Sequence, residues 1–111
     1  MIESMRVGSA TVLRVQGRLS AETGLRQAMR AAFEEGAPAV VFNLKDVTGV
    51  DSSGLAELLS CESIASNRGG RLVICSPSSK ANAVILVAQL HQVLNVYTTE
   101  EQALASIKPS S

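Results

Sequence analysis

Two short apolar segments, residues 39–44 and 72–75, constrain the fold of this chain more than any other feature. Each is bounded by turn residues and carries almost no polar side chain, which is typical of strands buried on both faces of a sheet. Segments with helical spacing of apolar residues separate and follow them. Such alternation predicts an α/β sandwich in which helices cover a small mixed sheet.

The chain is expected to begin with a β-hairpin. Residues Ile2–Val7 and Ala10–Gln16 flank Gly8-Ser9, a two-residue connection with glycine in the first place. We expect Gly17 to end the second strand and Ser20 to cap the helix that follows.

Four helices are expected after the hairpin, alternating with the buried strands. The first carries a clean apolar stripe and ends at Gly36, and a loop over residues 45–50 leads into the second, which ends near Asn67. The third covers residues 81–90, a last short strand covers Val93–Tyr97, and the fourth spans Glu100–Ile107 after a threonine cap. The stripe of the first helix consists of Leu25, Ala28, Met29, Ala32 and Phe33.

Length and composition narrow the classes of function. The 111 residues suit one domain, 1–111, with ten basic and ten acidic residues and three aromatic ones. Neither a basic nucleic-acid footprint nor a base-stacking platform is indicated. No segment is long enough to span a bilayer and the N-terminus does not look like a secretion signal, so we expect a cytoplasmic protein without membrane insertion. Cys61 and Cys75 are then expected to be reduced core thiols.

The sequence offers few parts for catalysis, and we expect no enzyme, no metal and no cofactor. His91 is the single histidine, so a two-histidine metal site is excluded, and its surroundings favour a structural or surface role. Neither a nucleotide phosphate loop nor a dinucleotide fingerprint occurs. A serine hydrolase built on Ser52 or Ser53 would lack an evident base and oxyanion hole.

The junction Asp51-Ser52-Ser53-Gly54 before the second helix is the unusual element. A helix cap explains one polar residue, Asp51 or Ser52, but explains three in a row poorly. Gly54 inside the first turn costs up to roughly 1 kcal/mol relative to alanine. A serine exposed at a helix start is also a natural phosphorylation site, because free N–H groups and the positive helix end favour a phosphate, although Asp51 would repel it. Composition leaves both readings open.

Several segments together give the chain a family likeness. The junction lies in Val50-Asp51-Ser52-Ser53-Gly54-Leu55, and the flanking segments are 12–19, 41–47, 90–97 and 99–104. With them the sequence resembles the anti-sigma factor antagonist family, the stand-alone STAS domains of sporulation and stress partner switching. The resemblance implies a STAS-like α/β fold with an N-terminal β-hairpin followed by alternating helices and strands.

The resemblance also implies a partner-switching function. The unphosphorylated protein would bind an anti-sigma factor that is also a serine kinase, and so free a sigma factor. Phosphorylation of Ser52 would release the kinase, and a serine phosphatase would reset the protein. Asp51, Ser53, Gly54 and Ser20 would contribute to partner binding. Ser20 departs from the family, which commonly carries an aspartate there that is expected to contact the kinase.

A second hypothesis is a structural STAS subunit that is never phosphorylated. It would belong to a signalling scaffold or a lipid-transport ATPase complex, and the helix face beside the junction would bind its partner. Ile64, which lies off the apolar stripe, would extend that surface.

Overall fold

The computed structural model describes residues 1–107 and consists of a five-stranded sheet with helices on both faces. The strands lie in the order β1-β2-β3-β4-β5; β1 is antiparallel to β2, and the other neighbours are parallel. The strands are β1 (Ile2–Val7), β2 (Ala10–Leu19), β3 (Ala39–Val50), β4 (Arg71–Cys75) and β5 (Val96–Tyr97). The helices are α1 (Leu25–Glu34), α2 (Ser52–Asn67), α3 (Ser79–Val87) and α4 (Glu100–Ile107), with short 3₁₀ turns η1 (Ala21–Thr23) and η2 (Leu90–Gln92).

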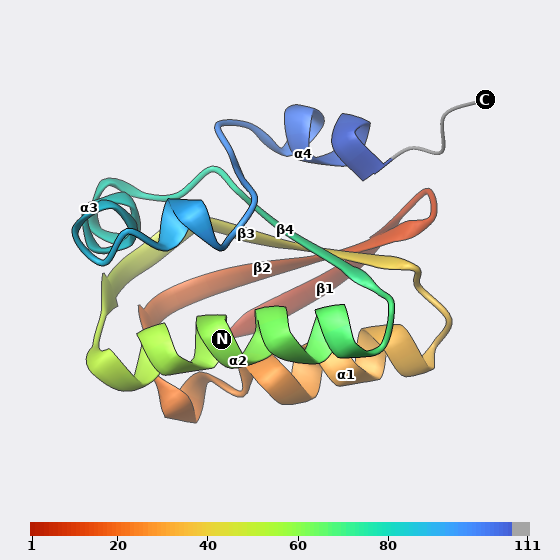
Figure 1. The fold of residues 1–111 in the computed structure, drawn as a ribbon, viewed down its shortest axis with the longest axis horizontal. Coiled ribbons are helices and arrows are strands. Elements are labelled where there is room, and N and C mark those ends of the chain that lie inside the picture. Colours follow the sequence, from red (N-terminus) through yellow and green to blue (C-terminus); the bar gives the residue numbers. More distant parts are fainter. Residues whose placement is uncertain (108–111) are drawn as a thin grey trace.

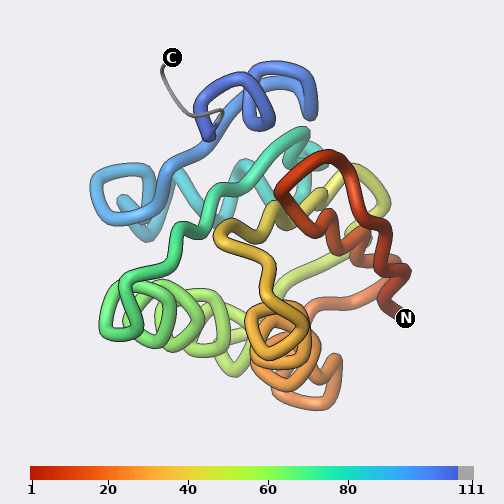
Figure 2. Tube along the Cα trace, turned by 90° about the vertical axis from the view of Figure 1, so that its right-hand side faces the viewer, coloured from red at the N-terminus to blue at the C-terminus, as the bar shows by residue number. Residues whose placement is uncertain are grey.

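The sheet separates two apolar clusters, so the predicted α/β sandwich around a mixed sheet is confirmed. Helices α1 and α2 cover one face and α4 covers the other, while α3 lies beside the end of β3 (Figures 1 and 2). The larger cluster lies under α1 and α2 and includes the fully buried Phe42, Met29 and Leu58. The smaller one lies under α4 and includes Val12 and Val41. Both faces of the two apolar strands are therefore buried, as a parallel strand requires.

The glycines predicted at the hairpin turn and at the end of α1 are where the structure requires them. Gly8 has a φ of +60° in the two-residue hairpin turn. At the end of α1, Gly36 has a φ of +98°, and the amides of Gly36 and Ala37 donate to the carbonyls of Phe33 and Ala32. This pair of bonds closes the helix in a Schellman arrangement, which explains why glycine follows it.

Two predicted boundaries near the junction are wrong. Gly17 does not end β2, which continues to Leu19, and residues 45–50 are not a loop but the second half of β3. The pairing of β2 with β3 is kept by two register shifts, at each of which β3 contributes one extra residue. Such bulges remove the regular alternation of polar and apolar residues. The polar stretch 45–49 therefore has the composition of a loop although it is paired.

The C-terminal third differs from expectation in smaller ways. Helix α3 begins at Ser79, capped by Ser78, and ends at Val87; Gln89, with a φ of +57°, breaks the segment that was expected to be helical to residue 90. Strand β5 contains two residues rather than five. Helix α4 has the predicted bounds, and the Thr99 hydroxyl accepts from the amide of Gln102 as its cap.

Candidate functional site

The site lies where β3 ends and α2 begins, and its first element is the Asp51 cap. One carboxylate oxygen of Asp51, Oδ1, accepts from the Gly54 amide at 2.8 Å and from the Ser53 hydroxyl at 2.6 Å. The Asp51 amide in turn donates to the Leu19 carbonyl at 3.2 Å. Asp51 is therefore the N-cap of α2 and is tied to the end of β2.

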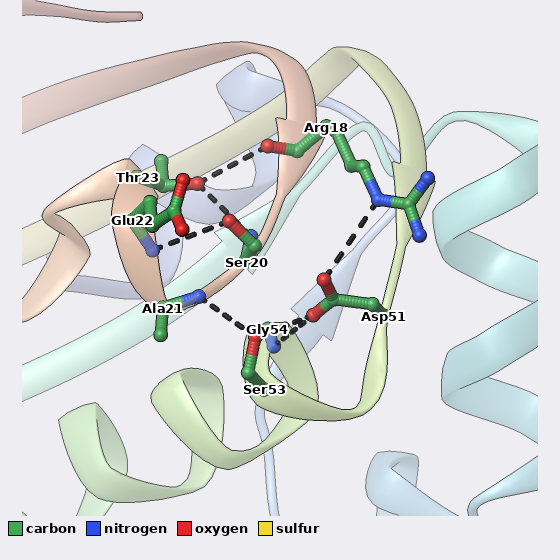
Figure 3. Close-up of polar contacts among 8 residues, drawn as sticks. All are labelled: Arg18, Ser20, Ala21, Glu22, Thr23, Asp51, Ser53 and Gly54. Atoms are coloured by element: carbon green, nitrogen blue, oxygen red, sulfur yellow. Dashed lines mark hydrogen bonds and ion pairs between the residues drawn. The ribbon is translucent and has the colours of Figure 1, made fainter.

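Ser53 connects the start of α2 to the segment after β2. Its hydroxyl oxygen accepts from the Ala21 amide at 2.9 Å while its proton goes to Asp51 (Figure 3). Both hydrogen-bonding functions of this hydroxyl are thus used inside the molecule. Ser53 thus ties the first turn of α2 to η1, 32 residues earlier in the sequence.

Gly54 allows this close contact. A Cβ at Gly54 would lie 2.7 Å from the Leu19 carbonyl carbon and would collide with its oxygen. The residue is buried, and the first turn of α2 therefore rests directly on the backbone of β2. The glycine that is unfavourable for the helix alone is thus required by packing across the junction.

Ser20 caps the turn η1 rather than α1, which begins after Gly24. The Ser20 hydroxyl accepts from the Glu22 amide at 3.2 Å, and the Ser20 amide donates to the Thr23 hydroxyl at 3.0 Å. The Thr23 hydroxyl donates onward to the Arg18 carbonyl at 3.1 Å. Serine at position 20 therefore caps this turn without placing a negative charge beside the junction.

Ser52 is the first residue of α2, and its side chain is exposed. Among residues 1–107, its hydroxyl has no hydrogen-bond partner, whereas the hydroxyls of Ser20 and Ser53 are both engaged. Figure 3 shows the engaged hydroxyls of Ser20 and Ser53 with their partners. The position places the Ser52 side chain on the turn where helix amides lack intrahelical acceptors.

Asp51 and Arg18 bring opposite charges together at the junction. Donation from the Ser53 hydroxyl and the Gly54 amide lowers the pKa of Asp51, and Arg18 contributes through its charge. The Arg18 Nε lies 3.8 Å from Asp51 Oδ2, and its side chain is 71% exposed. Asp51 is therefore a carboxylate at neutral pH, and an exposed guanidinium stands beside it.

The structure brings the residues singled out from the sequence, Ser20 and Asp51–Gly54, to one end of the sheet. Their roles in binding or modification stay predictions. Sequence reasoning missed Arg18 and Thr23, because it ended the second strand at Gly17, whereas β2 continues to Leu19 and includes Arg18. The pairing of Arg18 with Gly49 depends on the bulged register of β2 and β3, which no local pattern shows. Thr23 could have been found from its place three residues after Ser20, where the partner of a capping box lies.

Other reactive groups lie away from this site. Burial raises the pKa of the Cys61 thiol to about 12 and that of Cys75 to about 11, so both are protonated at neutral pH. His91 is exposed in η2. Within residues 1–107, His, Cys, Asp and Glu nowhere gather in groups of three that could hold a metal ion. None of the helices in that range has the length and apolarity needed to cross a membrane.

The fold and this junction define a small α/β domain that presents a free serine at a helix start. Residues 1–103 match the protein family described as "STAS domain". The chain therefore belongs to the STAS domain family.

Individual relatives agree with the family. The "Anti-sigma F factor antagonist" of Paenibacillus polymyxa is 24% identical over 100 residues, 87% of this chain and 86% of that protein. The Thermotoga maritima protein TM1081 has a TM-score of 0.82 at 20% identity, covering 97% of this chain and 95% of that one.

The anti-sigma factor antagonist SpoIIAA has been solved in two states. Its unphosphorylated form has a TM-score of 0.76 at 23% identity, covering 96% of both chains. The phosphorylated form, from Bacillus, has a TM-score of 0.72 at 22% identity, covering 97% of this chain and 100% of that one. The resemblance to anti-sigma factor antagonists inferred from the sequence is confirmed at the level of family and fold.

Proposed function

We propose that the chain is a cytoplasmic anti-sigma factor antagonist without catalytic activity of its own. Its unphosphorylated form binds an anti-sigma factor serine kinase and frees a sigma factor, and phosphorylation at Ser52 releases the kinase. A serine phosphatase restores the binding form. The observation that carries the proposal is the exposed Ser52 hydroxyl, which lacks a partner within residues 1–107.

The surroundings of Ser52 support a role as phosphoryl acceptor. Its neighbours Asp51 and Ser53 are held in the cap, so the chain on either side of the hydroxyl is fixed in position. A phosphate on Ser52 would stand at the positive end of a 16-residue helix, which favours an anion. Arg18 beside Asp51 offers a second positive charge, which offsets the repulsion between that carboxylate and the phosphate.

The same phosphate explains release of a partner. It adds a charge of about −1.5 to −2 at neutral pH to a surface that the kinase must cover. A buried charge without a partner costs several kcal/mol, and each 1.4 kcal/mol weakens binding about tenfold. Because Ser52 lies outside the core, this change alters the surface and leaves the fold intact.

A labelling experiment tests the site. Fractions of the source cells are incubated with the purified chain and radiolabelled ATP, and the labelling activity is purified. Ser79 provides a matched control, because it is also an exposed serine at the first position of a helix whose N-cap is the preceding residue. We expect Ser52→Ala to abolish labelling and Ser79→Ala to leave it unchanged.

Two results would overturn the proposal. Equal labelling of Ser52→Ala and the unaltered chain would move the site elsewhere. A Ser52 peptide without phosphate in every growth condition, measured by mass spectrometry of the chain from its own cells, would favour the structural-subunit hypothesis. In that case the partner would be found by co-purification without a kinase.

A further inference from the structure

From Ala83 to its end at Val87, helix α3 consists of apolar residues, although only one side of the helix is buried. Ala81 and Ile85 enter the core, whereas Leu86 and Val87 point outward with 54% and 86% of their surface exposed. Val93, directly after η2, is 55% exposed. Residues 81–97 contain no Asp, Glu, Lys or Arg. A concentration of exposed aliphatic side chains without charge is unusual on a soluble surface.

This apolar surface is adjacent to the start of α2. An entirely apolar groove of about 260 Å³ is formed by Leu55 of α2 together with four residues of α3 and its end: Ala83, Val84, Val87 and Ala88. Leu55 follows Ser52 by three residues, so their side chains are neighbours on the helix. Figure 1 shows α3 and the first turn of α2 at the same end of the molecule.

We propose that this groove, with the exposed Leu86 beside it, is the docking surface for the kinase that phosphorylates Ser52. The inference rests on the proposed function and adds the surface by which the partner is held. A specific partner covers about 800 Å² on each side, so a kinase that encloses Ser52 also covers its neighbour Leu55 and the groove that Leu55 lines. The apolar core of that interface would be supplied by the groove, and the phosphate would appear at its edge.

The chemistry of the surface favours a protein over a membrane. A helix that binds the lipid interface combines its apolar face with Lys and Arg residues and with Trp or Phe anchors. Helix α3 has a single charged residue, Lys80, and no aromatic one. The partner that fits is therefore a protein with an uncharged aliphatic patch next to its ATP site.

The test uses the full chain and the kinase purified by its labelling of the unaltered protein. Val87→Asp places a charge in the patch, and Met5→Asp is the control because Met5 is an exposed apolar residue on the edge strand β1. We expect Val87→Asp to raise the KM for the chain roughly tenfold or more with kcat little changed, because it removes binding that is uniform along the reaction. Met5→Asp should change neither value by more than about twofold. Circular dichroism melts of both variants check that they fold.

The outcomes separate this inference from the proposed function. If Ser52 is labelled and Val87→Asp is phosphorylated with the KM of the unaltered chain, the docking surface is wrong and the phosphorylation site stands. If no fraction labels Ser52, both proposals fall.

Sedimentation of the chain alone that shows a dimer lost in Val87→Asp would assign the patch to a second copy instead. Flotation with liposomes that is lost in Val87→Asp would assign it to a membrane; either result overturns the kinase assignment.

Discussion

Replacing Gly54 by alanine tests how the junction is built. In an ordinary helix this change stabilises by up to about 1 kcal/mol, because alanine has the higher helix propensity. Here the new Cβ would lie 2.7 Å from the Leu19 carbonyl carbon and 3.2 Å from the Ser20 nitrogen. Carbon atoms pack best at about 3.5–4.0 Å, so the first turn of α2 must move away from β2 by roughly 1 Å.

That movement lowers stability in two ways. Overpacking at a rigid backbone contact costs roughly 1–3 kcal/mol. The shift also stretches the 2.9 Å bond from the Ala21 amide to the Ser53 hydroxyl, which adds about 1 kcal/mol. After subtracting the propensity gain, we expect Gly54→Ala to lower the free energy of unfolding by about 2 kcal/mol. For a domain near this size the melting temperature would fall by roughly 8–15 °C.

The assay is thermal and urea unfolding followed by circular dichroism, with Gly49→Ala as the control. Gly49 lies in β3, has no positive φ and has open space where its Cβ would be, so alanine there should be neutral or slightly stabilising. If Gly54→Ala is as stable as the unaltered chain or more stable, the close contact between α2 and β2 is wrong and the helix start must lie farther from Leu19.

Three further predictions concern charges and thiols. Because the pKa of Asp51 is lowered in the folded chain, its carboxylate stabilises the fold above the unfolded pKa of about 4, and this stabilisation is lost as the pH falls through the lower folded pKa. The stability difference between the unaltered chain and Asp51→Asn should therefore be constant near neutrality and shrink in acid. Urea midpoints that differ equally at pH 7 and pH 2 would contradict this. In the folded chain the buried Glu57 lies 3.1 Å from the Arg26 Nε, and Arg26→Ala leaves it without this ion pair. Because Arg26 is half exposed, we expect the free energy of unfolding to fall by on the order of 1–2 kcal/mol, less than for a fully buried pair. Arg26→Ala combined with Glu57→Gln should recover part of that loss in urea unfolding. Cys61 and Cys75 should resist a thiol reagent at pH 8 until urea unfolds the chain, and rapid labelling of either thiol in the folded protein would show that the site is open.

Local signals in the sequence predicted much of the fold. The hairpin turn at Gly8, the end of α1 at Gly36 and the bounds of α4 each depend on residues within one turn of each other, and those interactions are short-ranged. The helical stripe that contains Met29 and Phe33 also follows from spacing alone, since a helix has a fixed period. Such features need no knowledge of the rest of the chain.

The remaining features depend on contacts between distant segments. Residues 45–50 become a strand because β2 runs beside them, and no local pattern shows the two bulges in that pairing. Gly54 is explained by the Leu19 carbonyl, 35 positions earlier, and Ser53 by the Ala21 amide. Sequence spacing therefore identified the polar residues of the junction but not their division between Asp51 and Ser53, which are engaged in the cap, and Ser52, which is left exposed.

In the proposed partner switch, a dianion at residue 52 expels the kinase from a domain that stays folded. The most direct measurement compares the unaltered chain with the same chain carrying phosphoserine at position 52, in kinase affinity and in melting temperature. We predict that the phosphorylated form binds the kinase at least about tenfold more weakly, while its melting temperature changes by only a few degrees. Equal affinity of the two forms, or unfolding of the phosphorylated one, would contradict the proposal.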